Sequence, residues 1–214
     1  MITNWDQIKI IGLILNKDVS ANAFNRDDYE SEIHAQGIRL FNQKLSQVGL
    51  TKKQDKDLSP FFHKATKVAV SGTIDMTSEN PAYIAYMIPN PMTARGFDEV
   101  TAGELADRLL NPITEPTLSD PIVCIGGKNL YDVYPSGILG ATVGYYSYPT
   151  KPVVRWTRNE TTLRPEYDTV NSIETEWDDV NKIEICYMIL RDAGLNIERR
   201  DVTQVADNII KTGK

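Results

Sequence analysis

The sequence predicts a mixed α+β fold, with helices at both ends of the chain and a β-rich segment in the middle. Near both termini, apolar residues recur at three- and four-residue spacing, which is typical of helices that bury one face. In the middle, prolines and glycines separate short runs of β-branched and aromatic residues. Since both ends carry apolar stripes, we expect the terminal helices to pack together within a single domain, residues 1–214.

The N-terminal helices are expected within residues 1–50. Thr3 can cap the first helix, whose apolar stripe runs through residues 5–15. A second stripe covers residues 25–48. At the other end of the chain, residues 179–211 carry two further stripes with helical spacing. These stripes predict the C-terminal helices.

Gly37 interrupts the second N-terminal helix. It lies in the apolar stripe, and a glycine inside a helix costs about 1 kcal/mol relative to alanine. Such a cost is compensated when a missing side chain allows a neighbour to come close. We therefore expect another backbone to approach the helix at Gly37.

The β-rich middle is expected to span residues 66–158 and to include one short helix. A capping box marks the start of this helix, because Thr101 and Glu104 can each accept a hydrogen bond from the other's backbone N–H group. The runs of strand-forming residues before and after it are bounded by proline and glycine. The expected strands are residues 68–74, 83–88 and 122–125.

Residues 130–148 are predicted to form the hairpin around which the middle is built. Two strand-like runs flank a Pro-Ser-Gly turn at residues 135–137. Pro149 and Pro152 then remove backbone donors and favour an extended exit. We interpret this exit as an exposed arm that binds a neighbouring subunit; the other interpretation is a surface loop whose tyrosines cover the domain's own core. The predicted interface residues are Tyr145, Tyr146, Tyr148, Pro149, Pro152, Val153, Val154 and Trp156.

Composition limits the class of protein. Of the 214 residues, 41% are hydrophobic and 24% are charged, and no apolar run is long enough to span a bilayer, so we expect a soluble globular protein with no membrane partner. No secretory signal follows Met1, which favours folding in a reducing cytoplasm. Cys124 and Cys186 are accordingly interpreted as small buried apolar residues. A net charge of −6 argues against a surface that grips nucleic acid.

The search for chemical motifs finds no catalytic, cofactor-binding or metal-binding pattern. His34 and His63 are the only histidines, and neither belongs to an HExxH motif. Residues 126–128, Gly-Gly-Lys, lack the spacing of a phosphate-binding loop, and Asn129 stands where that loop carries a hydroxyl. No serine lies in a GxSxG elbow. We therefore predict that the protein is not an enzyme and has no catalytic residues, no cofactor and no metal.

Acidic residues gather ahead of the first C-terminal helix. Glu174, Glu176, Asp178 and Asp179 precede or begin its apolar stripe. Carboxylates at the first turn favour the positive end of the helix dipole. This local role is the simplest interpretation of the cluster.

Short motifs also occur in a particular order over residues 16–206. They are Asn16-Lys17 with the helix from Phe24 to Leu45, Val100-Thr101 with Glu104 and Arg108-Leu109, Pro112-Ile113 through Pro116-Thr117, Pro121-Ile122, Val133-Tyr134-Pro135, Tyr145-Tyr146 with Pro149 and Pro152, Trp156, Tyr167-Asp168, Ser172 with Glu174, Asn181 and Ile183, and Gly194-Leu195-Asn196 with Asp201-Val202. In this order the chain resembles a family of virion structural proteins from tailed phages of the crAss-like group and their relatives. Residues 173–177 depart from the family pattern, because a more apolar strand end is expected before the helix.

The resemblance implies a head-to-tail connector or neck protein that forms a ring beneath the portal. Its partners would be copies of itself in the ring, the portal protein and other neck or tail proteins. Genomic DNA would pass through the channel without specific binding, and the protein would be localised in the virion after assembly in the host cytoplasm. The order of helices, strands and helices is also similar to that of short-tailed phage tubular and adaptor proteins, at the level of fold alone.

The sequence is also compatible with two other functions. A carbohydrate- or receptor-binding module would use exposed aromatic side chains, for which Tyr145, Tyr146, Tyr148 and Trp156 are the candidates. A small enzyme of unrecognised type would instead bring perturbed acidic groups together in an enclosed pocket.

Overall fold

The computed structural model describes residues 1–14, 26–48, 56–91, 96–161, 165–193 and 199–212. The fold class is α+β, as predicted, with a β-rich middle between helical ends. The chain divides into two compact units where a single domain was expected. One unit, here called the helical unit, comprises Met1–Pro60 and Pro149–Lys214. The other, the β unit, is Phe61–Tyr148.

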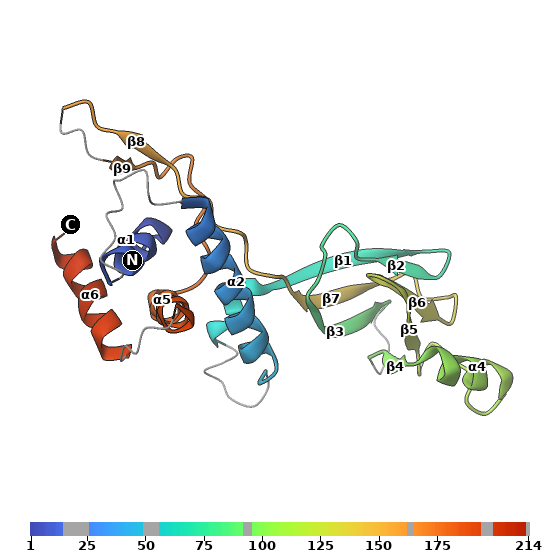
Figure 1. The fold of residues 1–214 in the computed structure, drawn as a ribbon. Coiled ribbons are helices and arrows are strands. Elements are labelled where there is room, and N and C mark those ends of the chain that lie inside the picture. Colours follow the sequence, from blue (N-terminus) through green and yellow to red (C-terminus); the bar gives the residue numbers. More distant parts are fainter. Residues whose placement is uncertain (15–25, 49–55, 92–95, 162–164, 194–198, 213–214) are drawn as a thin grey trace. The chain divides into compact units, whose positions relative to one another are not determined.

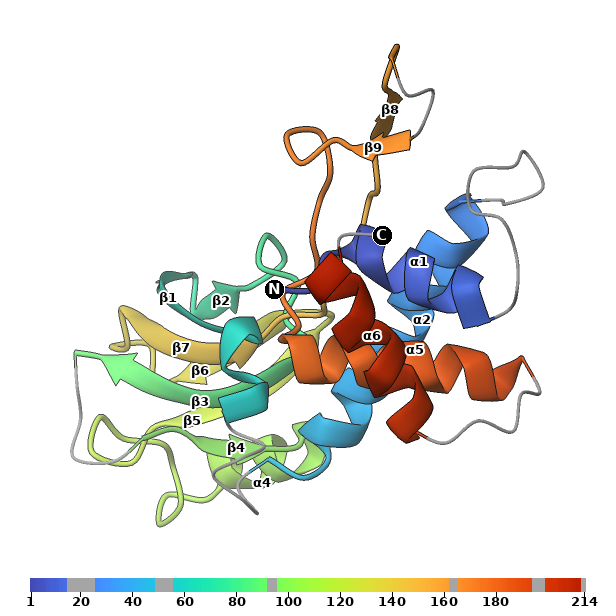
Figure 2. The same ribbon diagram turned by 90° about the vertical axis from the view of Figure 1, so that its left-hand side faces the viewer.

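Four helices of the described residues build the helical unit (Figures 1 and 2). Helix α5 contacts each of the other three, and it is seen nearly end-on among them in Figure 1. The predicted packing of the N-terminal helices against the C-terminal ones is therefore confirmed. The helices are α1 (Asn4–Ile14), α2 (Arg26–Leu45), α5 (Asp179–Asp192) and α6 (Arg199–Thr212).

The apolar stripes predicted from the sequence form the core of this unit. Ile8 and Ile11 of α1, Ile33 and Phe41 of α2, and Ile185 of α5 are fully buried. Side chains of this size each stabilise the fold by roughly 1.5–3 kcal/mol when they leave water. The core thus joins helices that are more than 100 residues apart in the sequence.

Gly37 has a close neighbour, but the neighbour is a side chain rather than the expected backbone. A Cβ atom at Gly37 would lie 3.3 Å from Nε1 of Trp177. Trp177 is buried just before α5, at the point where this helix contacts α2. The missing side chain of Gly37 therefore makes room for an indole ring.

The start of α1 is held by a local cap and by distant residues. The Thr3 hydroxyl accepts a hydrogen bond from the Asp6 N–H group at 3.1 Å, and the Asp6 carboxylate accepts one from the Thr3 N–H group at 3.0 Å. The predicted cap is thus present in reciprocal form. Asn4, the first residue of α1, donates its N–H group to Glu174 at 2.8 Å. Glu174 therefore accepts a hydrogen bond at the N-terminus of α1, whereas Asp178 caps α5.

Lys182 connects this N-terminal segment to α5. Its side chain is only 1% exposed, and its Nζ donates to the Ile2 carbonyl at 2.8 Å and to Glu174 at 3.0 Å. The Gln7 amide donates to the Lys182 carbonyl at 3.0 Å. A buried ammonium group is tolerated only when it is paired and hydrogen-bonded, and both conditions are met here.

The β unit is a curled seven-stranded sheet of the described residues, with the order β3-β7-β1-β2-β6-β5-β4. All neighbours are antiparallel except β4 and β5, which are parallel. A short 3-10 helix, η1 (Ser59–Phe61), leads into the first strand. The strands are β1 (Phe62–Val70), β2 (Thr73–Asp75), β3 (Tyr83–Asn90), β4 (Asp98–Val100), β5 (Ile122–Gly127), β6 (Leu130–Tyr134) and β7 (Gly140–Tyr146).

The predicted hairpin over residues 130–148 is wrong in its pairing. Both strands exist as β6 and β7, but β1 and β2 lie between them in the sheet. The predicted turn is present, since the Ile138 N–H group donates to the Pro135 carbonyl at 3.1 Å, but it leads Ile138 into the core and does not join paired strands. The predicted strand at 68–74 is likewise divided into β1 and β2, because Ser71 and Gly72 both have positive φ and make a two-residue turn.

The core of the β unit lies inside the curl of the sheet. Residues from β2, β5, β6 and β7 meet there, although β6 and β7 are not neighbours. The strands therefore pack across the curl rather than side by side. The buried members of this core are Ile74, Met76, Val123, Val133, Ile138, Ala141, Val143 and Tyr145.

The short helix α4 (Ala102–Leu110) follows β4, and its predicted capping box is confirmed. The Thr101 side chain accepts from the Glu104 N–H group, and the Glu104 carboxylate accepts from the Thr101 N–H group. None of its residues is fully buried. Leu105 packs partly against the small cluster formed by Val100, Ile122 and Cys124.

Replacing Lys182 with methionine should destabilise the helical unit. The variant keeps the length of the side chain but removes the cation bound to Glu174 and the donor to the Ile2 carbonyl, so we expect a loss of about 3 kcal/mol in the free energy of unfolding. Urea unfolding followed by far-ultraviolet circular dichroism measures it. The control, Arg39→Met, breaks the half-exposed pair with Asp192 and should cost less than about 1 kcal/mol. Equal losses in the two variants would contradict the prediction.

Two glycines of the β unit should respond oppositely to alanine. A Cβ atom at Gly140 would lie 2.1 Å from the Lys67 carbonyl oxygen, so Gly140→Ala should cost at least about 2 kcal/mol. A Cβ atom at Gly103, inside α4, meets nothing within 4 Å, and Gly103→Ala should stabilise by about 0.5 kcal/mol. Thermal unfolding of the two variants measures the difference. A stable Gly140→Ala protein would mean that β1 and β7 can separate.

Candidate functional site

Two of the predicted interface residues are buried in the β unit. Tyr145 and Tyr146 belong to β7 and are 8% and 7% exposed. The ring of Tyr146 packs edge-on against Phe62 of β1, with centroids 5.2 Å apart. Their description as exposed aromatic residues is therefore wrong, because β7 lies inside the sheet between β1 and β3.

The proline-containing segment is also held by its own chain. Pro149, Pro152 and Val154 are buried. Val153 forms a bridge with Ile173, in which each backbone N–H group donates to the other's carbonyl at 3.0 and 2.8 Å. The Val154 N–H group donates to the Glu30 carboxylate at 2.7 Å. The segment is extended, as predicted, but it lies along the helical unit and is not an exposed arm. That these residues form a subunit interface stays a prediction.

Tyr148 and Trp156 are the two predicted interface residues that are exposed, at 47% and 46%. Trp156 begins a two-stranded ribbon of β8 (Trp156–Arg158) and β9 (Pro165–Tyr167), in which it pairs with Tyr167. In Figure 1 the ribbon extends beyond the helices of its unit. The sequence did not predict β9, since Pro165-Glu166-Tyr167 has no alternating apolar pattern.

The base of the ribbon is fixed by hydrogen bonds. The Asp168 N–H group donates to the Arg155 carbonyl at 2.9 Å, and the Arg155 N–H group donates to the Ser172 hydroxyl at 2.8 Å. The Tyr167 hydroxyl donates to Glu174. Burial, together with this hydrogen bond, raises the pKa of Tyr167 to about 12. The ribbon is therefore anchored to the same carboxylate that receives Lys182 and α1.

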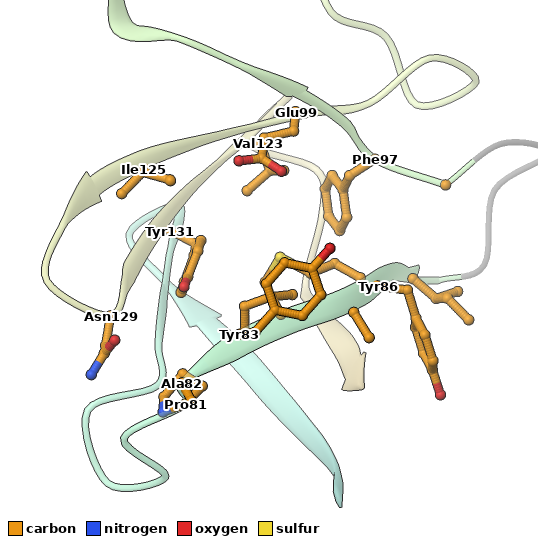
Figure 3. A pocket seen from close by; sticks show the side chains of 15 residues that line it. Pro81, Ala82, Tyr83, Tyr86, Phe97, Glu99, Val123, Ile125, Asn129 and Tyr131 are labelled. Carbon is orange, nitrogen blue, oxygen red and sulfur yellow. The ribbon is translucent and has the colours of Figure 1, made fainter. Parts of the chain in front are cut away.

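A cavity of about 790 Å³ lies in the β unit (Figure 3). It is bordered by β3, by the residues that lead into and form β4, and by parts of β5 and β6. The sequence predicts most of β3 but carries no signal for a cavity, because the cavity depends on the curl of the sheet. Its polar and aromatic lining includes Tyr83, Phe97, Glu99 and Tyr131.

Glu99 gives this cavity its electrostatic character. It is exposed, and of the fifteen residues that line the cavity it is the one with a charged side chain. Burial raises the pKa of the Tyr131 phenol, and the charge of Glu99 adds to the shift. The Tyr131 hydroxyl is therefore kept neutral and able to donate at all ordinary pH values.

The histidines and cysteines, which were the candidates for catalysis or metal binding, do not form a common site. His34 lies on α2, where burial and the charge of Lys151 lower its pKa, and His63 shares a hydrogen bond of 3.0 Å with the Ser147 hydroxyl. Cys124 and Cys186 are free and buried, as predicted. Among the described residues, no group of three or more His, Cys, Asp or Glu side chains is placed to hold a metal ion. Within the same residues, no helix has the length and apolarity needed to cross a bilayer.

Comparison with known proteins gives no identification. No protein-family model matches the chain, and no curated protein matches it significantly.

Tyr167→Phe should change how stability depends on pH. The folded-state pKa of Tyr167, about 12, lies above the unfolded value near 10, so its contribution is complete below pH 10 and is lost as the pH rises toward 12. We expect the variant to be less stable by about 1 kcal/mol at pH 8, and the wild type to lose stability relative to the variant between pH 10 and 12, so that the gap closes and then reverses. Urea unfolding at a series of pH values measures the gap. A gap that stays constant to pH 12 would show that the phenol does not titrate in this way.

Proposed function

We propose that the protein is a structural, non-enzymatic component of a phage virion that forms a head-to-tail connector ring beneath the portal. The observation that carries the proposal is the β8–β9 ribbon with its exposed Trp156. The order of short motifs along the sequence supports the same function. The ring partners are copies of this chain, and the portal and other neck or tail proteins lie above and below.

The ribbon has the properties of a subunit contact. An isolated pair of strands is marginally stable in water, because it has two unpaired edges and no core of its own. Here each of the two strands is three residues long, and the ribbon presents a half-exposed tryptophan. Tryptophan is among the residues that contribute most when they are buried at the centre of an interface. A neighbouring subunit that covers Trp156 would stabilise both the ribbon and the ring.

The hydrogen bonds at the base of the ribbon fix the direction in which it presents this side chain. Because Arg155, Asp168 and Ser172 hold it through backbone and hydroxyl groups, the ribbon does not need a partner to be oriented. A pre-ordered contact loses less conformational entropy on binding than a disordered one. In a ring, each subunit uses one surface to contact a different surface of the next, and the rotation closes the assembly.

The charge of the chain suits a channel through which DNA slides. With a net charge of −6, the protein lacks the excess of Lys and Arg with which proteins displace counterions from phosphates. DNA would therefore pass without specific binding. The proposal places the assembled protein in the virion, after assembly in the host cytoplasm.

Trp156→Ala tests the proposal. Truncating an aromatic anchor commonly costs 2 kcal/mol or more of binding free energy, which corresponds to about a thirtyfold loss of affinity. We expect the circular dichroism and melting midpoint of the isolated chain to stay nearly unchanged, while incorporation into virions or into complexes with portal rings falls strongly. Light scattering of mixtures with portal rings and quantification of the protein in purified particles measure these outcomes. Val180→Ala, which truncates another exposed apolar side chain of the helical unit, is the control.

The opposite pattern would contradict the proposal. If the variant melts several degrees lower but assembles normally, Trp156 stabilises its own chain and the ribbon is not a subunit contact. If portal rings and neighbouring tail proteins never retain even the wild-type protein, the connector function itself is wrong.

A further inference from the structure

The two ends of the seven-stranded sheet border the same cavity. Among the described residues, β3 pairs only with β7 and β4 only with β5, so these strands stand at opposite ends of the strand order. Yet Tyr83–Ile88 of β3 and Glu99 of β4 both line the cavity of about 790 Å³ (Figure 3). The sheet therefore curls until its ends approach each other, and the cavity occupies the seam that is left open. An added strand in this seam would bring the sheet closer to a closed barrel.

The cavity runs along the edge of β3. Side chains of a strand alternate between its two faces, so a cavity on one face would be lined by every second residue. Here every residue from Pro81 to Ile88 is part of the lining. The β-bulge between Ile84 and Tyr86 interrupts this alternation, but a bulge accounts for only one extra residue, so the rest of the lining points to a cavity along the edge of β3 that no described strand pairs. Pro81 and Pro89 bound this edge, and neither has an N–H group.

The lining carries one negatively charged side chain. Glu99 is its one charged residue, and no ion pair or hydrogen bond joins the Glu99 carboxylate to another described residue. Figure 3 shows Glu99, Phe97, Tyr83 and Tyr131 arranged around the same space. An aromatic ring attracts a cation over its face, and a carboxylate beside the ring adds a second attraction.

We propose that the seam binds an extended segment of a partner polypeptide, which adds to β3 as a strand and places a lysine or arginine side chain between Glu99 and the aromatic rings. Backbone hydrogen bonds along β3 supply affinity, and the cation supplies specificity. The edge from Pro81 to Ile88 spans about 24 Å at 3.4 Å per residue, which is far longer than a small amine would occupy. This inference does not depend on the connector function.

Nuclear magnetic resonance titration of the full chain tests the proposal. The probe is a blocked heptapeptide of alternating threonine and valine with arginine at its centre, compared with the same peptide carrying glutamine there. The arginine peptide should shift the amide signals of residues 82–88 and of Glu99 and slow the hydrogen exchange of the β3 amides. The glutamine peptide should bind about tenfold more weakly.

Glu99→Gln separates the charge from the strand contact. It removes the carboxylate at constant size, so the advantage of the arginine peptide over the glutamine peptide should disappear while the binding of the glutamine peptide stays the same. Glu115→Gln, another exposed acidic residue of the β unit outside the cavity lining, should leave both affinities unchanged. Circular dichroism of each variant checks that the β unit is folded.

Three results would overturn the proposal. The first is the absence of any shift along β3 at 10 mM peptide. The second is an equal affinity for both peptides in the wild-type protein. The third is that agmatine, a free guanidinium compound, shifts the Glu99 and Tyr131 signals as strongly as the peptide does and without protection of β3, which would identify the seam as a small-cation site instead.

Discussion

The ion pair between Lys182 and Glu174 is the interaction on which the helical unit depends. The Glu174 carboxylate accepts hydrogen bonds from the Lys182 ammonium, the first N–H group of α1 and the Tyr167 hydroxyl. One carboxylate thus joins α5, the N-terminal segment and the base of the ribbon. Lys182 also binds the Ile2 carbonyl, and Asp179 accepts from the Ile2 N–H group at 2.6 Å. A buried charge adds little net stability over an apolar core, but it tolerates few alternative arrangements. The pair therefore contributes more to the specific arrangement of α5 and the N-terminal segment than to the free energy that holds them together.

In the β unit the corresponding constraint is steric. Gly140 lies opposite Val68 of β1 in the sheet, where its missing side chain lets the Lys67 carbonyl approach. Gly144, four residues along β7, is covered by the ring of Tyr86 from β3. Strand β7 can thus sit closely between β1 and β3, and the sheet curls around the core formed by β2, β5, β6 and β7. The open seam at β3 and β4 is a consequence of this curl, since seven strands bring the sheet ends near each other without pairing them.

The features predicted correctly from the sequence are those that depend on near neighbours in the chain. The helical stripes, the caps at Thr3 and Thr101, and the buried cysteines all follow from residues within a few positions of one another. The pairing of β6 with β7 was predicted wrongly for the same reason, because a local turn between two strands does not reveal that β1 and β2 lie between them in the sheet. The Glu174 network and the cavity beside Glu99 join residues from distant parts of the chain. No spacing in the sequence could reveal them.

Unpaired strand edges, rather than exposed apolar side chains, distinguish the surfaces that this chain offers to partners. Ile113 and Leu110 are more exposed than Trp156, but single apolar residues on a surface are common in monomeric proteins. The ribbon and the seam differ from these because each combines an aromatic side chain with a backbone that lacks a neighbour on one side. An unpaired edge is a liability in a free chain, which proteins usually blunt with charge, proline or a cover. Among the described residues, Pro81 and Pro89 are the features of this kind near the edge of β3, and the aromatic lining beside it remains accessible. The simplest physical explanation for an edge left in that state is a strand supplied by another polypeptide.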